Sequence, residues 1–188
     1  DFDFGYCLEH YKILVVKTCY QSSWMAEWGQ PSDTLDPLYK SMYNYKWHWR
    51  HMIRAMKQHP DHFFVLWTNA PLVAANTSTE EARLSRSFSK WAADTLARGL
   101  DAESGPFPEN VLVFDYFSKV TDAGGFLKNS FAIPADNYHP NGAATDLIAP
   151  QFVREIFDAA VGYENIYAIE PAPEAAKIAI TPCPNPFL

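Results

Sequence analysis

Phe63-Phe64-Val65-Leu66-Trp67 is the part of this 188-residue chain from which its fold is inferred first. It is a continuous apolar run, and the turn sequence Thr68-Asn69-Ala70-Pro71 closes it. Two further runs have the same character, Ile13-Leu14-Val15-Val16 and Val111-Leu112-Val113-Phe114. Such runs are typical of strands covered on both faces, as in a parallel sheet. We therefore expect three buried parallel strands.

Helical patterns lie between these strands. From Asp36 to about Gln58, apolar residues recur at steps of three and four, which predicts one buried helical face. The members of this face are Leu38, Met42, Tyr45, Trp49, Met52 and Met56. A second helix is expected from near Thr79 to a glycine cap at Gly99, and a last helix from about Gly142 to Ala160. This order of elements predicts an α/β fold with a parallel sheet and right-handed crossovers.

The composition restricts the class of protein. The net charge is −7 and the sequence has no basic face, so nucleic acid is not an expected partner. No apolar run reaches the ~18 residues that a membrane span needs. We expect one α/β domain over residues 1–168 and a Pro-rich linker over 169–188. Three strands are few for a buried parallel sheet, so we expect it to be completed from outside this chain or by its N-terminal residues.

Candidate functional residues follow from the sheet, because ligands bind beyond the carboxyl ends of strands in open parallel sheets. Lys17, Thr18 and Asn69 follow two of the strands and are expected to line a cleft, although Asn69 also suits a turn. Asp136 and His139 lie just before the last helix. An Asp in this position can orient a His ring, which then acts as a general base. The alternative is that the two residues only cap the helix.

The sequence Asp136-Asn137-Tyr138-His139-Pro140-Asn141, followed by an amphipathic helix, resembles the last block of SGNH (GDSL-like) hydrolases. The order of the three strands resembles the same family over about residues 8–160. This resemblance implies a flavodoxin-like three-layer sandwich and ester hydrolysis by a Ser-His-Asp triad. His139 would be the base and Asp136 its orienting partner, with no metal and no organic cofactor.

The sequence departs from this family at two places. No G-D-S block is present, so the resemblance puts the first strand and the serine nucleophile before Asp1. Where the family has G-x-N-D, this chain has Lys17-Thr18-Cys19-Tyr20. Ser22 and Ser23 follow the first expected strand and are possible nucleophiles, but a polar contact within the loop is favoured for both.

The C-terminal sequence KIAITPCPNPFL resembles the start of a type IX secretion sorting domain. This resemblance implies a secreted or cell-surface protein that meets the secretion machinery through its tail; the alternative is an ordinary Pro-rich linker. Cys7 and Cys19 would pair if the compartment is oxidising, and would otherwise be small buried hydrophobes.

The sequence therefore predicts a serine-type ester hydrolase acting on a small ester or an acylated carbohydrate. An inactive SGNH-like module that binds glycan or protein is one alternative, and a structural subunit of a surface assembly is another. Tyr43 and Trp47 are the outward aromatic candidates for stacking on sugar, although burial explains most of the aromatic cluster. The histidines at 48, 51, 59 and 62 lack the acidic partner that a metal site needs.

Overall fold

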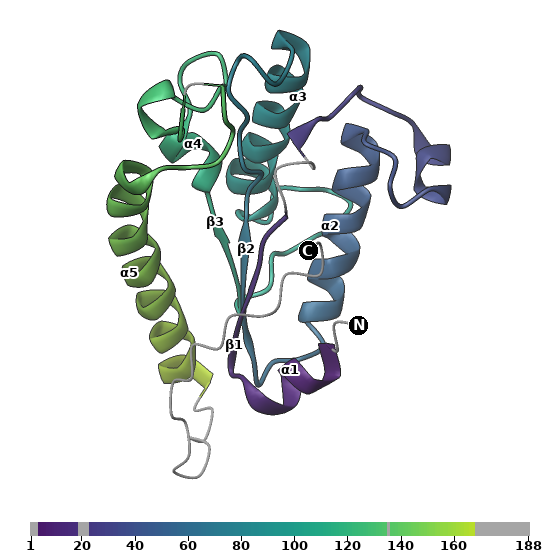
Figure 1. Cartoon of the computed structure of the whole chain (residues 1–188). Helices are drawn as coiled ribbons and strands as arrows, with labels where there is room; N and C mark the ends of the chain where they lie inside the picture. Colours follow the sequence, from purple (N-terminus) through teal and green to yellow (C-terminus); the bar gives the residue numbers. More distant parts are fainter. Residues whose placement is uncertain (1–3, 19–22, 135, 168–188) are drawn as a thin grey trace.

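The computed structural model describes residues 4–18, 23–134 and 136–167. They form a mixed α/β structure around a small open sheet of three parallel strands, in the order β1-β2-β3 (Figure 1). The strands are β1 (Ile13–Val16), β2 (Phe63–Trp67) and β3 (Val111–Phe114). The predicted parallel α/β character and all three predicted strands are confirmed.

The helices alternate with the strands and lie on both faces of the sheet (Figure 1). The elements are α1 (Phe4–His10), the 3-10 helix η2 (Pro31–Leu35), α2 (Met42–Met56), α3 (Thr79–Lys90), the π-helix η3 (Trp91–Leu96), α4 (Tyr116–Val120), the 3-10 helix η4 (Asn129–Phe131) and α5 (Gly142–Tyr167). The carboxyl ends of the strands and the start of α5 lie at the same end of the molecule, the top in Figure 1.

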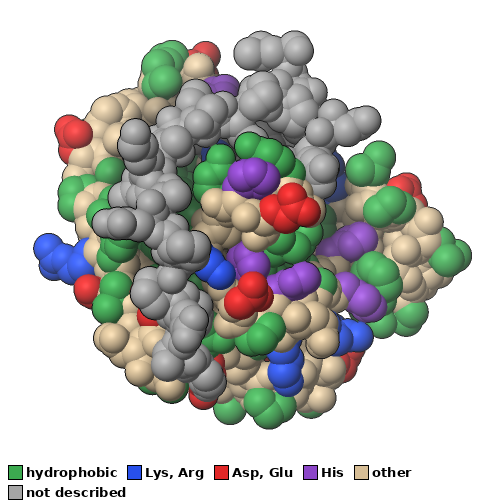
Figure 2. All heavy atoms as spheres, turned by 90° about the horizontal axis from the view of Figure 1, so that it is seen from below, with side chains coloured by type: hydrophobic (Ala, Val, Ile, Leu, Met, Phe, Trp, Pro, Cys, Tyr) green, Lys and Arg blue, Asp and Glu red, His purple; other side chains and the backbone are tan. Residues whose placement is uncertain are grey.

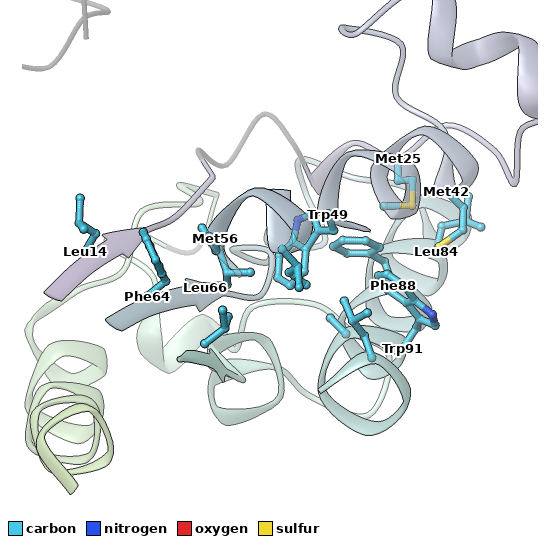
Figure 3. Close-up of a cluster of buried hydrophobic side chains, with 14 residues drawn as sticks. Leu14, Met25, Met42, Trp49, Met56, Phe64, Leu66, Leu84, Phe88 and Trp91 are labelled. Carbon is cyan, nitrogen blue, oxygen red and sulfur yellow. The ribbon is translucent and has the colours of Figure 1, made fainter. Parts of the chain in front are cut away.

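Strand β2 divides the interior into two cores, because successive side chains of a strand point to opposite faces. Phe64 and Leu66 belong to the α2–α3 core, which includes Trp49, Phe88 and Trp91 (Figure 3). The α5 core on the other face contains Phe63, Val65, Phe114, Ile148 and Ile156. The side chains of β2 from Phe63 to Leu66 are all buried, as the continuous apolar run predicts.

Helix α2 begins later than the periodicity predicts, at Met42 instead of Asp36. The Ser41 side chain accepts a hydrogen bond from the Asn44 backbone N–H and caps the helix there. Leu38, which the periodicity places on the inner face, lies before the helix and is 84% exposed. The apolar periodicity therefore predicts a helix start six residues too early, because the segment before Met42 forms turns instead.

Helix α3 has a capping box in which Ser78 and Glu81 exchange hydrogen bonds. The cap residue is thus Ser78, one residue before the predicted start at Thr79. Helix α3 continues as the π-helix η3, and this helical segment ends near Gly99. The φ of Gly99 is 67°, the left-handed conformation that favours glycine.

Helices α1 and α4 are absent from the sequence prediction, and α5 is longer than predicted. Helix α1 has only 7 residues, and α4 is a single short turn capped by Asp115, whose carboxylate accepts a hydrogen bond from the Ser118 N–H. Helix α5 runs to Tyr167 instead of Ala160 and contains Pro150 in its interior. No helix in the described residues is long and apolar enough to cross a membrane.

A buried ion pair holds the middle of α2. Arg50 donates to Asp101 from Nε (3.0 Å) and Nη2 (2.8 Å), and Trp91 Nε1 donates to the same carboxylate at 2.8 Å. Burial raises the pKa of Asp101, but the hydrogen bonds from Arg50 and Trp91 outweigh it and lower the pKa to about 2. The carboxylate therefore stays charged and ties α2 to the segment after η3.

Several sequence predictions fall outside the described residues. These are Ser22, the pairing of Cys7 with Cys19, and the linker and sorting-domain resemblance of residues 169–188.

Candidate functional site

The loop that carries His139 lies at the carboxyl end of the sheet. Asn137 Oδ1 accepts a hydrogen bond from the His139 backbone N–H (2.9 Å) and lies 2.7 Å from His139 Nδ1. The Tyr138 and His139 rings are stacked, with centroids 4.6 Å apart. His139 is exposed. Asn137 thus holds the ring through Nδ1, and Nε2 is the nitrogen that would act as a base.

Asp136 makes a different contact from the one predicted for it. Its backbone carbonyl accepts a hydrogen bond from Asn76 Nδ2, and its side chain is exposed. The acceptor that the structure gives to His139 Nδ1 is the amide of Asn137, one residue further on. The pairing of Asp136 with His139 stays a prediction.

Two other loops hold this segment in place. Asn76 follows β2 and donates to Asp136; Trp24 follows β1 and donates from Nε1 to the Asn76 carbonyl at 2.7 Å. The Trp24 ring also meets Tyr138 edge to face, at 6.2 Å between centroids. Sequence reasoning missed both residues, since neither lies in a recognisable motif. Their only signal was their position after the carboxyl ends of two strands.

Asn141 fixes the loop to the start of α5. Its side-chain N–H groups donate to the carbonyls of Ser130 and Ala132, each at 2.9 Å, and its Oδ1 accepts from the Ala144 N–H at 3.1 Å. This last bond caps the helix. The position of His139 therefore depends on an asparagine two residues away to which the sequence alone assigned no role.

A cavity of about 450 Å³ opens beside this loop, between β1, β2 and α5. Pro140, the residue after His139, lines it, so the backbone at His139 lies at its rim. Lys17 and Thr18, the two residues expected beyond the end of β1, also line it. Three aromatic rings, from Trp67, Tyr116 and Phe152, form much of its wall. Burial raises the pKa of Tyr116.

Two predicted site residues lie elsewhere. Ser23 is 2% exposed, and its hydroxyl donates to the Ala70 carbonyl, which favours the structural role. Asn69 is fully buried and its Nδ2 lies 3.4 Å from Ser85 Oγ of α3, so it is not part of the cavity wall. The aromatic candidate Trp47 is half-buried, and the His51 ring lies 3.7 Å from it.

Histidines gather at the opposite end of the molecule, which Figure 2 shows from below. His62 Nδ1 lies 2.9 Å from Asp61 Oδ1, its Nε2 donates to the Leu8 carbonyl at 2.6 Å, and its ring lies 6.1 Å from that of His59. Within the described ranges, no group of three or more His, Cys, Asp or Glu side chains is placed to hold a metal ion. Of these histidines, His62 joins α1 to the start of β2 through its contact with Leu8.

Comparisons of the chain with protein-family models, with curated proteins and with solved structures found no match.

Proposed function

We propose that this chain carries the general base of a serine-type ester hydrolase with a flavodoxin-like sandwich fold. The observation that carries the proposal is the juxtaposition of His139, whose Nδ1 is held by Asn137, with an apolar cavity at the carboxyl end of a parallel sheet. Ligands of open α/β sheets bind at this end. A histidine held through one nitrogen is suited to general-base catalysis through the other.

In the proposed reaction, His139 Nε2 takes the proton of a serine hydroxyl as its oxygen attacks the ester carbonyl. The tetrahedral intermediate collapses, the C–O bond to the alcohol breaks, and His139 gives its proton to the leaving alcohol. Water then releases the acid by the same two steps. The attacking serine is unassigned, because Ser23 is buried and Ser22 lies outside the described residues. The proposed substrates are extracellular esters, including acylated carbohydrates.

The test is hydrolysis of p-nitrophenyl esters by the complete protein and by its His139→Ala variant. We expect the substitution to lower kcat/KM by ~100-fold or more, because general-base catalysis contributes at least this much. His51→Ala is the matched control, since His51 is an exposed histidine on α2. Equal rates in the wild type and in His139→Ala would refute the proposal.

A second candidate is a binding module without catalytic activity. The observation in its favour is that the Ser23 hydroxyl, the one candidate nucleophile among the described residues, is buried and engaged with Ala70. Such a module would bind the same class of ligand with equal affinity in the wild type and in His139→Ala, and neither would hydrolyse an ester.

A further inference from the structure

The cavity beside His139 has a polar end and an apolar end. Lys17, Thr18 and Pro140 lie where β1 ends and the His139 loop returns to the sheet. Two turns of α5, from Thr145 to Phe152, form another part of the wall, which is apolar except for the hydroxyls of Thr68, Tyr116 and Thr145. These seven steps of the helix span about 11 Å at 1.5 Å per residue.

The apolar end combines large rings with small side chains. Trp67 lies against Phe152 with ring centroids 4.6 Å apart, and against Tyr116 at 4.9 Å. Ala70, Ala144 and Ala149 also line the cavity, and their small side chains take up little of its space. An alkyl chain that binds to such a surface is removed from water, which is favourable by about 25 cal/mol of free energy for each Å² of apolar surface buried.

The polar end carries a positive charge. Lys17 is exposed and forms no ion pair with any of the described residues. The hydroxyl oxygen of Thr18 is buried and has no hydrogen-bond partner in the described part of the chain. An ammonium and a hydroxyl at one end of an apolar cavity complement an oxygen-bearing head with an apolar tail.

We propose that this cavity binds an aliphatic acyl group of medium length, with its carbonyl or carboxylate end at Lys17 and Thr18. An extended chain of eight carbons is roughly 9 Å long, since each C–C bond of the zigzag advances it by about 1.3 Å, and it therefore fits within the length of the wall. If the acyl group belongs to an ester substrate, the inference rests on the proposed function. If the ligand is a free carboxylate, the inference stands without it. The preferred substrates would then be medium-chain esters, not acetyl esters.

The test measures octanoate binding to the wild type by calorimetry, without any hydrolysis step. Ala149→Phe places a ring in the cavity from an exposed helix position, and we expect it to weaken binding by at least ~10-fold. Ala143→Phe is the matched control, an exposed alanine on α5 outside the cavity wall, and should bind as the wild type does. Lys17→Met should weaken octanoate binding and leave binding of the neutral 1-octanol unchanged.

Hydrolysis separates this inference from the proposed function. If both hold, the wild type prefers p-nitrophenyl octanoate to the acetate, Ala149→Phe loses that preference, and the control Ala143→Phe hydrolyses both esters as the wild type does. Octanoate binding without hydrolysis of any ester leaves the cavity assigned and refutes the proposed function. The inference is overturned if the wild type does not bind octanoate, or if the wild type and Ala149→Phe bind it equally. Absence of binding is the result expected if an apolar side chain of another polypeptide fills the cavity.

Discussion

Asn137 is the residue that the structure places on His139 Nδ1, at 2.7 Å, whereas the side chain of Asp136 is exposed. Asn137→Ala should therefore lower kcat for ester hydrolysis by ~10-fold or more, because the ring loses the contact that fixes its orientation. Asp136→Ala should have a smaller effect. The measurement is kcat and KM for the two variants. A larger loss of kcat in Asp136→Ala than in Asn137→Ala would show that Asp136 orients the His139 ring.

Asp101 offers a test of the buried ion pair with Arg50. Asp101→Asn should lower the free energy of unfolding at pH 7 by ~3 kcal/mol, since it removes the buried carboxylate charge that faces the Arg50 guanidinium. Glu103→Gln is the control: Glu103 contacts the same guanidinium at 3.0 Å but is 65% exposed, so we expect a change within ~0.5 kcal/mol.

The pH dependence of this effect follows from the direction of the pKa shift. The pKa of Asp101 is lowered from 3.8 to about 2 in the folded protein. A lowered pKa stabilises the fold above pH ~4, and this stabilisation disappears as the pH falls towards 2. Urea unfolding at a series of pH values should show the difference between wild type and Asp101→Asn shrinking over that interval. A difference independent of pH would contradict the assignment.

At the scale of elements, the start of α5 determines where His139 lies. Asn141→Ala removes the helix cap and the two hydrogen bonds to the Ser130 and Ala132 carbonyls. We expect a loss of at least ~1 kcal/mol in the free energy of unfolding, together with lower esterase activity. Asn165→Ala, the same change at an exposed position of α5, should stay within ~0.5 kcal/mol. Equal unfolding midpoints in the two variants would show that Asn141 does not stabilise the loop.

The strands were predictable because a short continuous apolar run between turn residues is typical of a buried strand. The helix ends were less predictable, because caps such as Ser41 and Asp115 act through local hydrogen bonds that compete with the apolar period. The candidate site was predictable only as a region. Its His139 loop follows from the sequence, but the contacts from Trp24 and Asn76 depend on the meeting of three loops distant in sequence. The contact from Asn137 is local and depends on the conformation of the His139 loop itself.

At the scale of the whole molecule, β2 is shared by the α2–α3 core and the α5 core, so we expect the two cores to unfold together. Leu66→Ala and Ile156→Ala each delete a buried aliphatic side chain, one from each core, and each should cost ~2–5 kcal/mol. Circular dichroism and tryptophan fluorescence should show one coincident transition for both variants. Two separate transitions would show that the cores are independent units.

The central claim is that His139 activates a serine for attack on an ester. A fluorophosphonate tests this most directly, because it reacts with an activated serine, releases fluoride and leaves a label that mass spectrometry can locate. We predict that one hydroxyl of the complete protein is labelled, and that His139→Gln slows the labelling by ~100-fold or more. Equal labelling rates for the two proteins, or no labelling of the wild type, would contradict this claim.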